Sequence, residues 1–214
     1  MKTSTRIFLG CLTGIQLLYF PLNRLSTGGI APFIPLDAYI PLWPVWAVPY
    51  LLIVACWPVA VAWAVFFAKD EELTALVASI LTASLAGIVT FTLFPTYVIR
   101  PEITAQGWAA DLLRWIYAND GAYNALPSGH VYMTTVLAYY GQRWFPKVRG
   151  LFPALVVVIL LSTLFTHQHY LLDLAAGLLV GLAACSIGPW AARLFFPQPK
   201  PKPARLIKAP SPKE

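Results

Sequence analysis

Three short segments hold polar side chains that could do chemistry in an otherwise apolar chain. The first is Arg100 with the proline that follows it, the second is a Pro-Ser-Gly-His stretch ending at His130, and the third contains His169 and Asp173. Histidine can act as a nucleophile or exchange protons near neutral pH, and arginine binds phosphate through two parallel hydrogen bonds. These residue types predict nucleophilic or acid–base chemistry on a phosphate group.

The Pro-Ser-Gly-His stretch is typical of the start of a helix. Proline has no N–H to lose at the first helical position, which leaves the N–H groups of Ser128, Gly129 and His130 free to point outward. Such a helix end favours an anion through its dipole and its donors. We therefore expect a phosphate site here; the alternative is a capped helix start with an incidental histidine.

His169 and Asp173 are four residues apart, so on a helix the carboxylate would lie beside the imidazole. That contact would fix the tautomer and leave the other ring nitrogen free to attack or to take a proton. A His/Asp pair at this spacing also occurs by chance, which is the alternative. His167 should face elsewhere, because it is only two residues from His169.

Arg100 is followed by a proline that interrupts the chain, so we expect it near the end of a helix. There it could bind a phosphate, or it could be an interfacial arginine that extends its side chain toward water.

The composition shows what must position these side chains. Of 214 residues, 58% are hydrophobic and 11% are charged, with a mean hydropathy of +0.67. A soluble domain carries about 25% charged residues, so a water-soluble globular protein and a disordered chain are both excluded. The formal charge is +6, but the basic residues flank apolar runs and fill the C-terminal tail, so nucleic acid is not indicated as a partner.

The hydropathy pattern predicts an all-α polytopic membrane protein, a bundle of six transmembrane helices within residues 1–196. We interpret the first apolar run as a retained helix, because no small-x-small cleavage site of a signal peptide follows it. The six runs are 7–22, 45–67, 74–94, 128–142, 151–166 and 171–195.

Three further segments complete the predicted organisation. Residues 26–44 contain a Gly-Gly pair and prolines and should be interfacial or re-entrant. The loop after the third run holds a short amphipathic helix at about 106–119, on the outer membrane face. Residues 197–214 should form a disordered basic cytoplasmic tail rich in Pro and Lys.

The basic residues predict the topology. With a cytoplasmic N-terminus, twelve of the fifteen lysines and arginines lie on the cytoplasmic side, leaving only Arg24, Arg100 and Arg114 outside. Both termini are then cytoplasmic, and the three polar segments meet at the outer face of a plasma or inner membrane.

In order and spacing, the three segments resemble the motifs of the type-2 phosphatidic acid phosphatase superfamily, the membrane relatives of vanadium haloperoxidases. That family has a lysine, six residues and Arg-Pro; then Pro-Ser-Gly-His; then Ser-Arg, five residues, a histidine, three residues and an aspartate. The second motif matches completely here. The first has Leu93 in place of lysine, and the third, which starts at Ser162, has Thr163 in place of arginine.

The resemblance implies six transmembrane helices and a role for each matched residue. His169 would attack phosphorus to give a phosphohistidine, and Asp173 would stabilise the imidazolium. His130 would protonate the leaving alkoxide and then activate water or an acceptor hydroxyl. Arg100, Ser128 and Gly129 would bind the phosphate.

No metal and no other cofactor is implied. The three candidate site segments hold no carboxylate cluster beyond Asp173, and Cys11, Cys56 and Cys185 have no metal-ligand spacing.

The substrate class stays open at this point. The resemblance implies a phospholipid, polyprenyl phosphate or sphingolipid phosphate, with water as acceptor in a phosphatase and a lipid or polyol hydroxyl in a transferase. The variant motifs look like the branch of inositol phosphorylceramide and sphingomyelin synthases. The sequence also leaves open a non-enzymatic member of the fold and a metal transporter using His167 and His169, although these histidines lack further ligands. The oligomeric state is not predicted.

Overall fold

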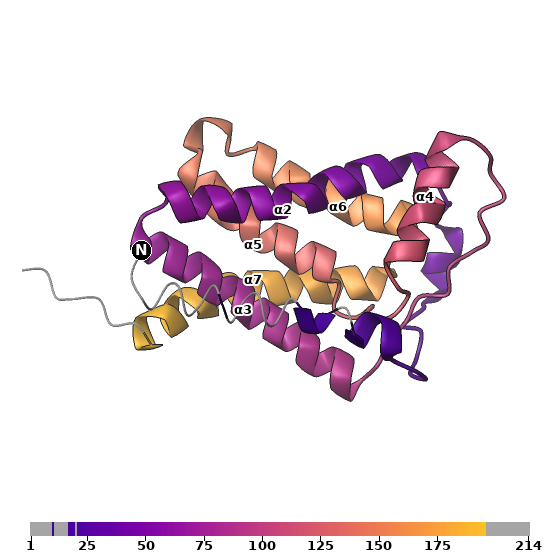
Figure 1. Ribbon diagram of the computed structural model, residues 1–214, viewed down its shortest axis with the longest axis horizontal. Coiled ribbons are helices and arrows are strands. Elements are labelled where there is room, and N and C mark those ends of the chain that lie inside the picture. Colours follow the sequence, from indigo (N-terminus) through magenta and orange to yellow (C-terminus); the bar gives the residue numbers. More distant parts are fainter. Residues whose placement is uncertain (1–9, 11–16, 20, 196–214) are drawn as a thin grey trace, which may run out of the picture.

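The computed structural model describes residues 10, 17–19 and 21–195, and this part of the chain is helical (Figure 1). Most of the predicted first helix (7–22) and the whole predicted tail (197–214) lie outside the described residues. The helices are η1 (Pro35–Tyr39), η2 (Pro44–Trp46), α2 (Ala47–Phe67), α3 (Asp70–Leu93), α4 (Trp108–Asn119), α5 (Gly129–Trp144), η3 (Pro146–Val148), α6 (Leu151–Phe165) and α7 (Leu171–Phe195).

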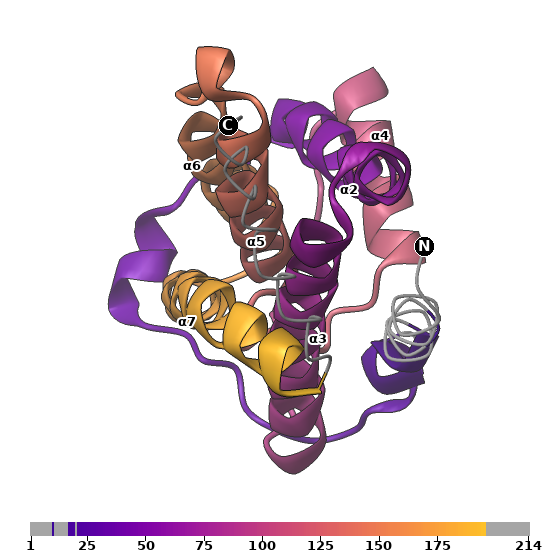
Figure 2. The same cartoon turned by 90° about the vertical axis from the view of Figure 1, so that its left-hand side faces the viewer.

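Helix α5 lies at the centre of the bundle and packs against α2, α3, α6 and α7. Figures 1 and 2 show these long helices running side by side, with α4 across one end. The main core joins α2, α3, α5 and α7 through apolar side chains such as Leu76, Val136 and Cys185. Two glycines on α7 let it approach α5 closely: a Cβ at Gly177 would lie 2.7 Å from the Ser128 carbonyl oxygen, and one at Gly181 would lie 2.8 Å from Thr135 Cβ.

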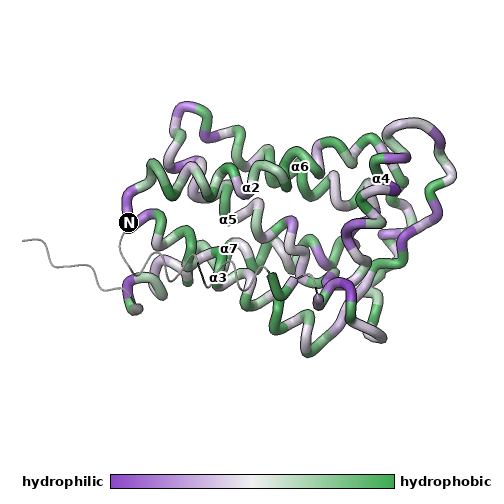
Figure 3. Tube along the Cα trace, in the orientation of Figure 1, coloured by the Kyte–Doolittle hydropathy of each residue, from purple (hydrophilic) through white to green (hydrophobic). Residues whose placement is uncertain are grey.

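Three helices among the described residues are long and apolar enough to cross a membrane: Pro44–Phe67, Asp70–Leu93 and Leu171–Leu194. They carry large apolar side chains that point outward, as lipid-facing helices do. Hydrophilic residues gather mainly toward the two ends of the bundle (Figure 3). Helices α5 and α6 have only 16 and 15 residues, so six spans stay a prediction.

The predicted helix boundaries differ most from the observed ones at α3. The apolar run was expected to begin at residue 74, but the helix starts at Asp70, and its first turn holds Asp70, Glu71 and Glu72. Carboxylates near a helix N-terminus interact favourably with its dipole. A search for apolar residues alone therefore begins this helix one turn late.

Helix α4 covers the segment where the sequence indicated an amphipathic helix. Its buried side chains are Ala110, Leu113 and Ile116, and the last two pack into a core shared with α2 and α6. Trp108 and Trp115 of this helix are largely exposed. The helix therefore closes one end of the bundle with one face and leaves its tryptophans outside.

The interrupted segment 26–44 runs around the outside of α7 to reach α2 (Figure 2). Its Asp37 is buried and uses both carboxylate oxygens: Oδ2 accepts from the Ile34 N–H at 2.9 Å and Oδ1 from the Leu171 N–H at 2.9 Å. Leu171 is the first residue of α7. Asp37 thus caps the helix that carries part of the candidate site.

We expect Asp37→Asn to destabilise the protein by about 1–3 kcal/mol, because an amide has one acceptor oxygen for two buried N–H groups. Thermal unfolding in detergent measures this as a lower Tm. The matched control is Asp111→Asn, which removes only an exposed ion pair with Arg114 and should change stability by less than about 1 kcal/mol. Equal Tm values for the two variants would contradict the capping role.

Candidate active site

The candidate site lies at the end of the bundle closed by α4, where α2, α5 and α7 begin (Figure 1). His130 is the second residue of α5 and Asp173 the third of α7. His169 precedes α7, so the prediction that His169 and Asp173 share a helix is wrong. The sequence spacing nevertheless brings the two side chains together, because the chain turns at Tyr170 and the Asp173 carboxylate folds back over that turn.

The two histidines meet although 39 positions separate them. His130 Nδ1 lies 3.0 Å from His169 Nε2. On its other side, His130 Nε2 lies 2.7 Å from the Tyr50 hydroxyl, and the rings of Tyr50 and Trp57 flank it with centroids at 4.9 and 5.7 Å. His130 thus joins a residue of α2 to the predicted nucleophile.

His169 and Asp173 are close but not aligned as a hydrogen bond. Their Nδ1 and Oδ2 atoms are 3.4 Å apart, and His169 Nδ1 has no hydrogen-bond partner among the described residues. Asp173 Oδ2 accepts the Tyr170 N–H at 2.9 Å instead. The contact is therefore electrostatic, and it favours a proton on Nδ1, which leaves the lone pair of His169 on Nε2, facing His130.

The Pro-Ser-Gly-His stretch begins α5, one residue later than predicted. Ser128 is the N-cap, and Pro127 precedes the cap rather than standing at the first helical position. The Ser128 N–H donates to the Asp173 carbonyl oxygen at 2.9 Å, and its hydroxyl accepts the Val131 N–H at 3.4 Å. The expectation that the Ser128 N–H points outward is wrong, because the close contact between α5 and α7 uses it.

Arg100 lies seven residues beyond the end of α3, not near it as predicted. Its guanidinium stacks over the Tyr117 ring, 4.5 Å from the centroid. Nη1 donates to the carbonyl oxygens of Tyr117 and Asp120, at 3.3 and 2.6 Å, and Nη2 donates to that of Gly121 at 2.9 Å and to Gln168 Oε1. Arg100 therefore ties the end of α4 to the segment that carries His169.

Gln168 is a site residue that the sequence motifs do not specify. Its Oε1 accepts from Arg100, while its Nε2 and the Arg100 Nε are buried and have no hydrogen-bond partner within the described chain. Buried donors without an acceptor are rare in proteins. Here two such donors belong to side chains that are hydrogen-bonded to each other, and a bound anion could accept from both. In the sequence, Gln168 stands out only as the residue directly before His169 in the variant third motif.

The two departures from the family motifs have different surroundings. Leu93 is 65% exposed at the last turn of α3. Thr163 is fully buried, and its hydroxyl donates to the Ile159 and Leu160 carbonyl oxygens at 2.9 and 3.0 Å. The Thr163 carbonyl accepts the N–H groups of Gln168 and His169. Neither side chain replaces a cation, but the Thr163 carbonyl holds the segment that carries His169.

A second carboxylate, Asp120, stands beside the histidines and was also missed. Its Oδ1 and Oδ2 are 3.3 Å from the hydroxyls of Tyr19 and Tyr50. Burial raises the pKa of the Asp120 carboxyl, and the charges of Arg100 and His169 oppose that shift. The contacts link Asp120, Tyr50, His130 and His169 in one chain of polar groups.

His167 lies apart from the linked polar groups Asp120, Tyr50, His130 and His169, as the sequence predicted. Its Nε2 is 3.1 Å from the Ile40 carbonyl oxygen, and burial lowers the pKa of its imidazole. No group of three or more His, Cys, Asp or Glu residues that could hold a metal ion occurs in the described part of the chain.

Comparison with known proteins identifies one family. A family model described as the PAP2 superfamily matches residues 36–187. This range includes all three motif segments and confirms the resemblance inferred from them. No curated protein and no solved structure matches the chain.

Proposed function

The chain belongs to the PAP2 superfamily, and we propose that it is a lipid phosphatase or phosphotransferase that works through a phosphohistidine. Membership of the family supports phosphatase-type chemistry on lipid phosphates. The observation that supports this mechanism best is the contact between His130 Nδ1 and His169 Nε2 at 3.0 Å. A nucleophile and an acid must face each other across the phosphoryl group, and these two side chains come from separate motifs to do so.

In the proposed first step, His169 Nε2 attacks phosphorus while the bond to the leaving oxygen breaks. Asp173, 3.4 Å from Nδ1, stabilises the imidazolium that forms. His130 gives its proton to the leaving alkoxide. In the second step His130 takes a proton from water or an alcohol, whose oxygen attacks phosphorus and releases His169.

Substrate must separate the two histidines. Attack requires about 3–3.5 Å between nitrogen and phosphorus, and the acid must then lie about 2.6–3.2 Å from the leaving oxygen on the far side. The observed 3.0 Å between the ring nitrogens leaves no room for a phosphoryl group. His130 therefore moves away from His169 when the phosphate enters.

The phosphate would bind to Arg100 Nε and Gln168 Nε2, the two buried donors without an acceptor in the described chain. Gln168 then stands near the nucleophile where the family's arginine is lacking. The sequence predicted that Ser128 and Gly129 both bind the phosphate. The Ser128 N–H already donates to the Asp173 carbonyl oxygen, so of these two residues we retain only the Gly129 N–H as a phosphate donor.

We place this end of the bundle on the non-cytoplasmic side of a plasma or inner membrane, with both termini cytoplasmic. The support is the distribution of charge. Arg24, Arg100 and Arg114 contact α4 or its flanking segments, whereas the other basic residues of the described chain lie at the opposite end. Those residues are Lys69, Arg143, Lys147, Arg149 and Arg193.

A headgroup transferase of the inositol phosphorylceramide synthase type is the second candidate, and the charges of the site favour it. Arg100 is the one fixed cation among the described groups of the site, beside the carboxylates of Asp120 and Asp173. Leu93 and Thr163 add none. A doubly charged phosphomonoester would be poorly neutralised, whereas a phosphodiester carries a single charge.

Purified protein in detergent, incubated with a panel of radiolabelled phospholipids, tests the function. Release of inorganic phosphate indicates a phosphatase, and transfer of label to an added diacylglycerol, ceramide or polyol indicates a transferase. Absence of both reactions over the whole panel, from protein that unfolds cooperatively, would contradict the proposed function and favour a non-enzymatic member of the family.

A further inference from the structure

A cavity of about 400 Å³ opens beside His130, between α2, α4 and α5. Its wall on α2 consists of Leu51, Val54 and Trp57, which recur at helical spacing on one of the membrane-length helices. Ile116 and Met133 continue the apolar wall on α4 and α5. An apolar cavity of this size along such a helix fits a hydrocarbon chain.

The polar end of this cavity differs from the proposed phosphate site. Tyr50, Asp120 and His130 line it, whereas Arg100, Gln168 and His169 do not. A carboxylate accepts hydrogen bonds and repels an anion. Tyr50 lies 2.7 Å from His130 Nε2 and 3.3 Å from Asp120 Oδ2, and its single proton cannot serve both acceptors fully. This end therefore suits a hydroxyl group and not a phosphate.

Resting on the proposed function, we propose that this cavity binds the lipid alcohol of the reaction, with Tyr50 and Asp120 as positioning residues for its hydroxyl. In the forward direction the P–O bond breaks and the alkoxide takes the His130 proton in this cavity. In the reverse direction an alcohol gives its proton to His130, its oxygen bonds to phosphorus, and the bond to His169 breaks.

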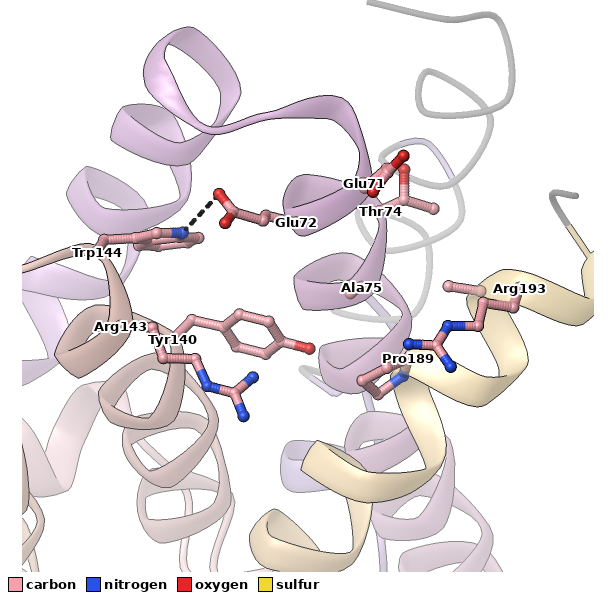
Figure 4. A pocket seen from close by; sticks show the side chains of 10 residues that line it. Glu71, Glu72, Thr74, Ala75, Tyr140, Arg143, Trp144, Pro189 and Arg193 are labelled. Carbon is pink, nitrogen blue, oxygen red and sulfur yellow. Dashed lines mark hydrogen bonds between the residues drawn. The ribbon is translucent and has the colours of Figure 1, made fainter. Parts of the chain in front are cut away.

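The cavity at the opposite end of the bundle does not fit this role. It has a volume of about 250 Å³ and is lined by charged side chains of α3, α5 and α7, including Glu71, Glu72, Arg143 and Arg193 (Figure 4). No histidine lines it, and Glu72 accepts a hydrogen bond from Trp144 Nε1 at 3.2 Å. It does not reach the reacting groups.

A larger side chain placed in the cavity tests whether the cavity binds the hydrocarbon chain of the substrate. Val54→Trp should lower kcat/KM for a phosphate ester with oleoyl chains by about tenfold or more, while the same ester with butyryl chains keeps its kcat/KM within about twofold. The matched control is Val59→Trp on the same helix, which is 66% exposed and outside the cavity, and which should change neither value. Equal loss for both esters, or no loss for either, would overturn the assignment.

The hydroxyl site has a separate test that does not enlarge a side chain. For Tyr50→Phe and Asp120→Asn, phosphoenzyme is formed from an activated aryl ester, whose leaving group needs no proton, and its transfer to an acceptor is then followed. Transfer from the phosphoenzyme to added diacylglycerol should fall about tenfold relative to transfer to water. An unchanged ratio would overturn the role of this pair, whereas failure of the wild type to form any phosphoenzyme would instead contradict the proposed function.

Discussion

His169→Gln should lower turnover more than about 10³-fold and remove the phosphoenzyme altogether. The amide approximates the size of the imidazole and can remain beside Asp173, but it has no nitrogen lone pair to place where Nε2 faces His130. Rapid quenching with radiolabelled substrate measures the effect, since a phosphohistidine is labile to acid and stable to base.

The matched control for this prediction is His167→Gln, two residues away. His167 Nε2 lies 3.1 Å from the Ile40 carbonyl oxygen, and glutamine keeps a donor for that contact. Its turnover should stay within about twofold of the wild type. If His169→Gln retained a phosphoenzyme of the same lability, another residue would be the nucleophile and the assignment of His169 would be wrong.

The sequence predicted the central pair of this site because each histidine has a local signal. His130 follows a proline and a serine that begin a helix, and His169 stands four residues before an acid. Both motifs lie at helix starts, and helices that cross a bundle in the same direction begin at the same end. The pairing of α5 with α7 therefore brings His130 and His169 together.

The surrounding polar groups could not be predicted in the same way. Tyr50 contacts His130 from 80 positions away, and Asp120 belongs to a loop whose course depends on how α4 packs. Gln168 becomes informative only when Arg100 is seen to bond its oxygen and leave its nitrogen unpartnered in the described chain. No periodicity in the sequence encodes such contacts.

For the fold as well, features set by neighbouring residues were predictable, and features set by residues far apart in the sequence were not. Apolar runs located each described long helix, and the errors lie at the ends, where charged or capping residues decide the boundary. The role of Asp37 was not predictable, because it caps a helix that begins 134 positions later.

Arg100→Lys should lower kcat/KM more than tenfold, at least about 1.4 kcal/mol, although the charge is kept. Arg100 donates to three carbonyl oxygens and to Gln168, and its buried Nε is the donor proposed for phosphate. An ammonium group has three donors at one point and lacks the planar fork that spans these acceptors. Lysine can hold the end of α4 or face the phosphate, but not both.

Comparing kcat/KM with Tm separates these two roles. Gln168→Glu, with arginine retained, keeps an acceptor for Arg100 Nη2 but turns the unpartnered donor into an anion. It should therefore lose kcat/KM while Tm changes little, whereas Arg100→Lys should lower both. Arg114→Lys is the matched control, because Arg114 bonds α4 to the preceding loop and lies outside the site. Should Arg100→Lys lower Tm without lowering kcat/KM in protein that remains folded at the assay temperature, Arg100 would be only the tie between α4 and the His169 segment, and the phosphate would have to be held by other donors.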